Sequence, residues 1–499
     1  MNDSEFQQFI QTFRNTVKNL ISNEEALETV NHLEGLPREL LDQILASSPL
    51  SVFIPTAYGG DGGKPDRCLT LLETASYESI AIGLLLGING SLFLDPVGKY
   101  GSEVAKAHVF KRFLQDKTLG GLMITEPDYG TDALAMQTFY QETEKGGHIQ
   151  GEKHWGGLTG LADFWLMTAR KKKPNGNLSR DVDLFICEMD QPGQRIVVES
   201  YYHKLGLFLI PYGLNRVDIT VPLTSRLTPQ TSGLKLMMDL LHRSRLRLSG
   251  IGLGFIKRLL DEALDHCRSR SVSGGMLNSY DQVQYRLAEL QAWYTINSGM
   301  CFYTSKVSSI ESDLSGLGLQ ANANKAILTD IMQDAAQSLL QLVGAKGYRR
   351  DHIAGRAIVD CRPFQIFEGS NDVMYSQTAD LFIKEMKRAK ESNLYRFCTG
   401  FEPVSRATMH FRDLLDVSFD LDAVQRVRVR LGKIVAWLLS IGYVLDLADH
   451  GFRRDLIDNA IAVVRLKIAE QAIGLSQSKP RSLIEDYVDG GDWKRLKGR

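Results

Sequence analysis

The chain has 499 residues, which exceeds what one hydrophobic core usually supports, so two to four domains are expected. Its 58 basic and 59 acidic residues give a net charge of −1, which excludes the positive field typical of nucleic-acid-binding proteins. Six scattered cysteines without Cys-x-x-Cys spacing, and ten histidines without a ligand motif, predict neither a disulfide framework nor a metal site. The acidic N-terminus resembles no secretory signal and no apolar run approaches the ~20 residues of a membrane span, which predicts a soluble, cytoplasmic protein.

Apolar residues follow helical spacing over about residues 1–120, and Ile80–Gly87 is apolar on every side, which predicts a buried helix. The pattern changes over 121–232. There, short apolar runs flank the polar turn Lys171–Asn177, and the run ending at Pro222 alternates strictly, as strands do. We therefore predict a helical N-terminal domain followed by a central β domain.

Long helical patterns resume over 233–389 and predict a helical domain. Within it we expect three helices, over Leu248–Cys267, Gln282–Ser309 and Asn322–Val343. Residues 390–499 predict an appended helical region with one strongly apolar and one amphipathic helix. The fold class is thus mainly α with an inserted β domain.

Two distant segments carry the strongest functional signal. In Gln365–Asp372, the carboxylate of Glu368 follows two apolar residues and precedes a small-residue turn, so it is expected at the edge of an apolar pocket. Burial there raises the pKa of a carboxyl group, which suits a general base. Far upstream, Met123–Asp132 reads Met-Ile-Thr-Glu-Pro-Asp-Tyr-Gly-Thr-Asp.

Together these segments resemble the acyl-CoA dehydrogenase family of flavoproteins. Three further matches occur in the family's order, at Ser51–Gly60, Gly151–Trp155 and Gln341–Tyr348. The resemblance covers about residues 30–385. It implies a helical N-terminal domain, a central β barrel or sandwich, a C-terminal four-helix bundle, bound FAD and a homodimer or homotetramer.

By this resemblance, Glu368 is the catalytic base, and Arg245 and Gly369 contact the substrate. Residues that match the family's cofactor-binding positions come from five parts of the chain: Met123, Thr125, Gly130, Thr131, Trp155, Gly156, Gly157, Arg270, Gln341, Gly344, Ser370 and Asp372. Arg270 is expected to reach FAD phosphate across a subunit interface. A fixed guanidinium fork suits that contact.

The sequence departs from the family in two places. Trp155 is followed by Gly156-Gly157, where the family has a hydroxyl side chain that touches the flavin. The motif around Arg270 lacks the family's phenylalanine. Each assignment has a structural alternative. Trp155 could be an ordinary core residue, and Arg245 and Arg270 could be surface residues without a binding role.

The favoured activity is α,β-dehydrogenation of an acyl thioester, carried by coenzyme A or an acyl carrier protein, with electrons passed to an electron-transfer flavoprotein. Two alternatives stay open. The Gly156-Gly157 change leaves open the alternative that the protein is an oxidase or monooxygenase that uses O₂. The incomplete motif around Arg270 leaves open the alternative that the protein is a catalytically degenerate relative, which only binds acyl groups or partner proteins.

The appended region has two interpretations. Arginines alternate with valines ahead of its apolar helix, and Arg453 and Arg454 follow that helix. Either the helices pack on the body or on another subunit, or they make a peripheral membrane contact. The extension also suggests acyl chains of some length, because some long-chain members of the family carry one.

Overall fold

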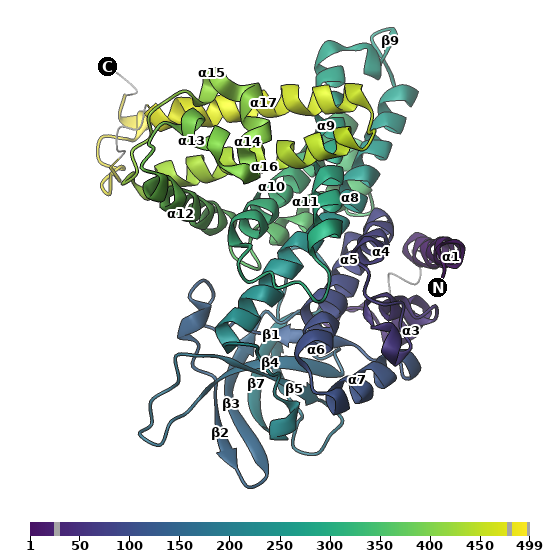
Figure 1. Ribbon diagram of the computed structural model, residues 1–499. Helices are drawn as coiled ribbons and strands as arrows, with labels where there is room; N and C mark the ends of the chain where they lie inside the picture. The colour runs from purple at the N-terminus through teal and green to yellow at the C-terminus, as the bar shows by residue number, and fades with distance from the viewer. Residues whose placement is uncertain (24–29, 477–481, 497–499) are drawn as a thin grey trace.

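The computed structural model describes residues 1–23, 30–476 and 482–496. Strands gather at one end of the molecule, long helices run from them towards the other end, and the last helices lie against that bundle (Figure 1). This architecture confirms the predicted fold class of a mainly helical chain with an inserted β domain.

The N-terminal helices surround one buried segment. The helices are α1 Asp3–Ser22, α3 Arg38–Leu45, α4 Pro65–Glu78, α5 Ile80–Gly87, α6 Asp95–Tyr100 and α7 Glu103–Gln115. Every residue of α5 is buried, as its uniform apolarity predicts. A π-helical turn, η3 Ile88–Leu94, joins α5 directly to α6. Such turns are rare and often occur at functional sites.

The β domain is one seven-stranded sheet with two parallel pairs, β1–β4 and β2–β4. Its strands are β1 Gly120–Met123, β2 Phe139–Thr143, β3 Gly146–His154, β4 Phe164–Lys171, β5 Asp183–Glu188, β6 Val197–Tyr201 and β7 Gly213–Val221. The polar turn Lys171–Asn177 lies between the antiparallel strands β4 and β5, as predicted. The strands meet the bundle where β1 ends.

The bundle is built on one helix longer than expected. Its helices are α8 Gly233–Ser269, α9 Asp281–Val307, α10 Gly318–Val343, α11 Ile353–Cys361 and α12 Asn371–Ala389, with a short hairpin of β8 Ser271–Val272 and β9 Gly275–Met276 after α8. The predicted start of α8 at Leu248 is wrong by 15 residues. Arg243 and Arg247 of this helix are buried in the protein interior. Arg243 forms an ion pair with Asp239, and Arg247 forms one with Asp95.

Glycines in α8 allow close contact with α4. A Cβ added at Gly254 would lie 2.0 Å from the carbonyl oxygen of Glu73, and one at Gly250 would lie 3.0 Å from that of Leu69. Both distances are at or below the closest approach that side chains tolerate. Gly250 and Gly254 are therefore a helix-packing feature.

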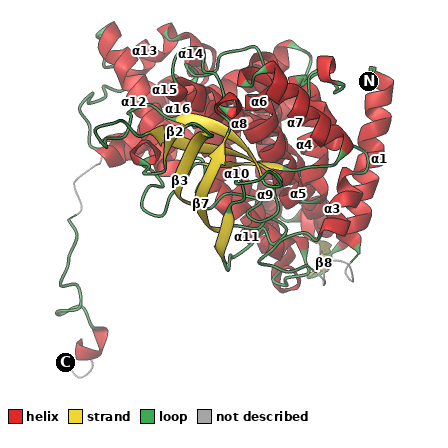
Figure 2. Ribbon diagram, turned by 90° about the horizontal axis from the view of Figure 1, so that it is seen from below, coloured by secondary structure: helices red, strands yellow, loops and turns green. Residues whose placement is uncertain are grey.

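The appended region packs on the bundle. Its helices are α13 Leu394–Gly400, α14 Glu402–Thr408, α15 Arg412–Leu415, α16 Gln425–Asp449 and α17 Arg454–Ser476. Trp437 of α16 stacks on Trp293 of α9, with ring centroids 5.6 Å apart. Arg453 and Arg454 pair with Asp455 and Asp458. Seen from below, residues 482–496 lie away from the body (Figure 2).

Two described helical segments have the length and hydropathy of a membrane span, Ile80–Tyr100 and Gln425–Asp449. They are 94% and 78% buried inside the protein. Burial of this extent is typical of core helices, and both segments pack against neighbouring helices of the fold.

Candidate functional site

A cavity of about 820 Å³ lies where η3, the β domain, α8 and the start of α12 meet. Nine of the residues singled out in the sequence line it: Thr125, Gly130, Thr131, Trp155, Gly156, Gly157, Arg245, Glu368 and Gly369. They come from segments more than 240 residues apart. The fold therefore brings the two strongest sequence motifs to one cavity.

Glu368 sits in a strained turn at the cavity wall. Its φ is +52°, in the left-handed region that non-glycine residues rarely occupy, and Gly369 follows at +98°. The Glu368 Oε1 atom accepts a hydrogen bond of 2.8 Å from the Ser244 hydroxyl. Within the described chain, buried Oε2 has no hydrogen-bond partner. Ser244 thus holds one carboxylate oxygen, and the other makes no hydrogen bond to the described residues.

Burial raises the pKa of the Glu368 carboxyl group, while the Arg245 guanidinium, the Ser244 hydroxyl and the Lys325 ammonium oppose that rise. A carboxylate whose pKa is moved towards neutrality is a better proton acceptor at physiological pH than an exposed glutamate. The predicted position at the edge of an apolar pocket is therefore confirmed.

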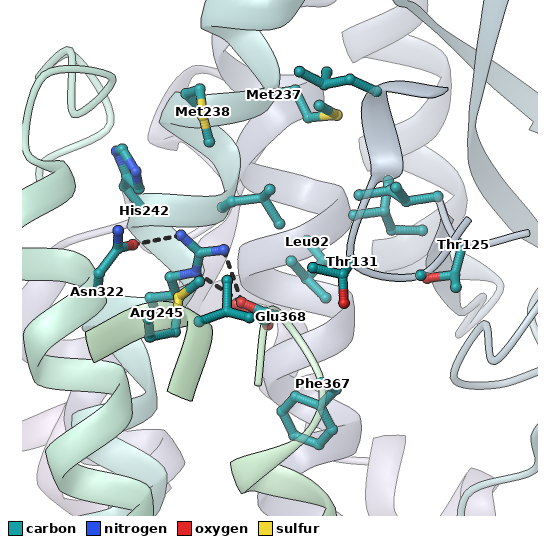
Figure 3. A pocket seen from close by; sticks show the side chains of 18 of the residues that line it. Leu92, Thr125, Thr131, Met237, Met238, His242, Arg245, Asn322, Phe367 and Glu368 are labelled. Atoms are coloured by element: carbon teal, nitrogen blue, oxygen red, sulfur yellow. Dashed lines mark hydrogen bonds between the residues drawn. The ribbon is translucent and has the colours of Figure 1, made fainter. Parts of the chain in front are cut away.

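Arg245 clamps the same turn from α8. Its Nε and Nη2 atoms donate to the Glu368 carbonyl oxygen at 3.1 and 2.7 Å, and its Nη1 donates to Asn322 Oδ1 at 2.7 Å (Figure 3). The side chain is 5% exposed, so the alternative of a helix-surface cation is wrong. Arg245 fixes the backbone that carries Glu368.

Lys325 of α10 is a second buried cation behind the turn. Its Nζ donates to the Gly369 carbonyl oxygen at 2.6 Å and to Asn371 Oδ1 at 3.0 Å. Burial lowers its pKa to about 7, although the nearby Glu368 carboxylate opposes this change. Two successive carbonyl groups of the strained turn are therefore held by buried cations.

The Thr125–Thr131 segment forms another wall of the cavity. A Cβ at Gly130 would meet no atom within 4 Å, so this position faces open space. Glu126 anchors the segment from behind: it accepts a 2.8 Å bond from the buried Lys153 Nζ, which also bonds to the Ile124 carbonyl oxygen. This pairing gives Glu126 a structural role.

Trp155 is 51% exposed, which rules out the alternative of an ordinary core tryptophan. It lines the cavity with φ +55° and packs against Tyr202 and Tyr212, with centroid distances of 4.6 and 5.9 Å. A Cβ at Gly157 would lie 2.7 Å from Ile88 Cδ1. The missing hydroxyl at this position is thus matched by tight packing against η3.

Six of the singled-out residues do not line this cavity. Met123 is buried at the end of β1, and Ser370 and Asp372 lie at the start of α12. Arg270 and Gln341 are exposed, and Gly344 (φ +72°) is exposed beside Gln341. None of these last three residues belongs to the cavity wall.

Sequence reasoning missed several polar residues of the site: Ser244, Asn322, Lys325 and His242. His242 lines the cavity, and its Nδ1 lies 2.8 Å from the Leu314 carbonyl oxygen, which leaves Nε2 as the acceptor of the neutral ring. These residues lie on helices without a local motif. For His242 and Ser244 the available signal was the cluster of polar residues between Asp239 and Arg247 in α8, whereas Asn322 and Lys325 of α10 left no such signal.

Sequence profiles of the acyl-CoA dehydrogenase N-terminal, middle and C-terminal domains match residues 3–117, 121–214 and 231–381. The chain belongs to the acyl-CoA dehydrogenase family. Members of this family are FAD-dependent oxidoreductases that act on CH–CH donors, as the sequence resemblance implied.

Relatives are distant along the whole match. The short-chain-specific acyl-CoA dehydrogenase of Megasphaera elsdenii is 24% identical over 353 residues, 70% of this chain and 90% of that protein. The caffeyl-CoA reductase–Etf complex subunit CarC of Acetobacterium woodii is 22% identical over 362 residues, 72% of this chain and 94% of that protein.

An acyl-CoA dehydrogenase from Bacillus anthracis, solved in complex with FAD, has the same fold with a TM-score of 0.77 at 17% identity. The alignment covers 95% of this chain and 89% of that one. The shared fold therefore includes most of the appended helices and is not restricted to the three family domains.

The acyl-CoA dehydrogenase cavity described above fits a flavin. It has the size for a tricyclic ring, an open glycine at Gly130, flanking threonine hydroxyls and the aromatic face of Trp155. Glu368 lines the same cavity, and within the described residues its buried Oε2 has no hydrogen-bond partner. Each of these features is what an FAD ring beside a proton acceptor requires.

Proposed function

We propose that this protein dehydrogenates an acyl thioester between its α and β carbons, with Glu368 as the α-proton base. The observation that carries the proposal is the Glu368 carboxylate itself: buried, raised in pKa, and unpartnered at Oε2 in a cavity that fits a flavin. FAD would supply the hydride acceptor for the β-carbon.

The protein's part is to remove a weakly acidic proton. Ser244 orients the carboxylate, and Arg245 holds the Glu368 carbonyl oxygen and so fixes the peptide group that joins Glu368 to Gly369. By the family resemblance, the Glu368 N–H donates to the thioester carbonyl oxygen, where negative charge develops. Gly369 keeps the wall beside the thioester thin.

The cofactor would be held by two groups of residues. Met123, Thr125, Gly130, Thr131, Trp155, Gly156 and Gly157 surround or support the ring region, and Ser370 and Asp372 flank it at the start of α12. We assign Arg270, Gln341 and Gly344 to FAD of a neighbouring subunit, because they are exposed and separate from the cavity. This assignment requires a homodimer or homotetramer.

The proposed electron acceptor is an electron-transfer flavoprotein, in line with the Etf complex named for the A. woodii relative. One observation favours a second candidate that uses O₂: positions 156 and 157 are glycines that line the cavity, so neither supplies the hydroxyl side chain that the family has after this tryptophan. Anaerobic bleaching of the flavin by a thioester panel, followed by admission of air, distinguishes the two. Rapid reoxidation by air would favour the oxidase.

The same experiment tests the proposal as a whole. The purified protein should be yellow or reconstitute with FAD, and an acyl thioester should bleach it and yield the 2,3-enoyl product. A colourless protein that cannot take up FAD would instead support the degenerate relative.

A further inference from the structure

The active-site cavity is closed where α5 and η3 line it and open elsewhere. Its exposed lining residues include Gly316, Gln377, Asp380 and Leu381, which form a mouth on the bundle side, and Gly130, Thr131 and Trp155 on the β-domain side. Leu84 and Ile88 of α5 and η3 are 6% and 5% exposed and form the closed end. On the proposed function, a phosphopantetheine-bearing carrier must extend out through the mouth, so the acyl carbons point towards the closed end.

A second, much smaller cavity lies directly behind the closed end. Its volume is about 10 Å³, and it shares Leu84, Ile88, Leu92 and Glu368 with the main cavity. This volume holds roughly one water molecule. An acyl chain that passes Glu368 therefore meets space for little more than one further carbon atom.

The wall that closes this space is rigid. Arg247 and Asp95 form an ion pair in which both side chains are 1% exposed, and the Arg247 guanidinium packs over the Phe53 ring at 5.7 Å. Breaking such a pair to admit a chain would leave a buried charge, which is strongly unfavourable. Ile251 closes the other side, with its Cδ1 3.2 Å from where a Cβ of Gly87 would lie.

The wall is also partly polar. Within the described part of the chain, Ser91 Oγ and Arg247 Nε are buried atoms without hydrogen-bond partners. A methylene group placed against them would exclude water from both atoms and offer no replacement bond. Size and polarity thus disfavour the same substrates.

We propose that the substrate is a thioester of a short acyl group, of roughly four carbons, because the space behind Glu368 holds about one atom-sized group. This inference rests on the proposed function and opposes the longer acyl chains that the appended region suggested. The length limit is set by α4, η3 and α8, far from that region.

The test compares pantetheine thioesters of four, eight and sixteen carbons on the FAD-loaded protein, so that the identity of the natural carrier does not matter. We expect kcat/KM to fall by about tenfold or more from four to eight carbons, since added methylenes have no pocket to enter. Calorimetric titration with the matching 2-enoyl thioesters should show the same order of affinity.

Ile251→Ala should move the preference towards six carbons, because it enlarges the closed end. Ile256→Ala is the matched control: the residue is on the same helix, is equally buried and lines neither cavity. It should keep the profile of the parent protein.

Turnover and affinity that are equal or higher for eight or sixteen carbons would overturn the inference, as would identical length profiles for the two alanine variants. Failure of every thioester to bleach the flavin contradicts the proposed function instead. In that case the calorimetric order with chain length still decides the inference.

Discussion

The Glu368 turn and the Arg270–Gln341 surface differ in how complete they are within one chain. Around Glu368, Ser244 holds the carboxylate, and Arg245 and Lys325 hold the two backbone carbonyl groups of the turn, all within one chain. Arg270 and Gln341 are exposed and contact no part of the cavity. If the proposed function holds, one subunit is sufficient to position the base, whereas the proposed FAD contacts of Arg270 and Gln341 would need a second subunit.

The largest effect is expected from Glu368→Gln. The amide keeps the size of the side chain but cannot accept the α-proton, so flavin reduction should slow by about 10²–10⁴-fold or more. FAD content and thioester affinity should be unchanged. Anaerobic stopped-flow absorbance measures the rate, and calorimetry measures the affinity. Reduction at the parent rate would reject Glu368 as the base.

Lys325→Met should act mainly through pH. Glu368 must be ionised to accept a proton, so the rate should rise with pH through the pKa of that carboxyl group. Burial raises this pKa and the Lys325 ammonium lowers it, so loss of the charge should shift the rising limb to higher pH. A pH profile of anaerobic reduction measures the shift.

Lys384→Met is the control for that change, because Lys384 is an exposed residue of α12. It should leave the profile in place. If Lys325→Met lowers the rate equally at every pH, Lys325 supports the turn sterically and has no electrostatic influence on Glu368.

Arg270→Ala tests the exposed surface that contains Arg270 and Gln341. Loss of a phosphate contact is expected to reduce FAD affinity by about tenfold, with an unchanged reduction rate at saturating FAD. Titration of apoprotein with FAD, followed by fluorescence, measures the affinity. Arg362→Ala, at another exposed arginine, should have no effect. Equal affinities in both variants would place Arg270 outside the cofactor site.

The smallest effect is expected for binding of the appended helices to lipid vesicles. The apolar residues of α16 are buried against the bundle, and Arg453 and Arg454 are paired with aspartates. Co-sedimentation of the full chain with anionic vesicles should therefore be weak. Strong, salt-sensitive pelleting would instead favour the peripheral membrane contact.

Much of this fold follows from sequence periodicity, because helices and strands here alternate in long, regular blocks. The β domain and the uniformly buried α5 are examples. The start of α8 could not be predicted, because Arg243, Arg245 and Arg247 look like exposed residues until their partners are known. Those partners, including Asp95 and Asn322, come from other helices.

The site shows the same limit. Glu368 and the Thr125–Thr131 segment were predictable because both lie in distinctive local sequence motifs, and Glu368 has a left-handed backbone conformation. Lys325 and His242 act from regular helices, where no special residue order is needed. The closed end of the cavity depends on Ile251 and Arg247 packing against η3, which only the tertiary structure reveals.

The ion pair between Arg428 of α16 and Asp380 of α12 has a consequence for how substrates arrive. Asp380 lies at the cavity mouth, and the two side chains meet at 3.0 Å. Without Arg428, a bare carboxylate would repel the phosphate groups of an incoming carrier. The appended helices thus place a counter-charge beside one carboxylate of the entrance, and on the proposed function the association rate of a polyanionic carrier would depend on it.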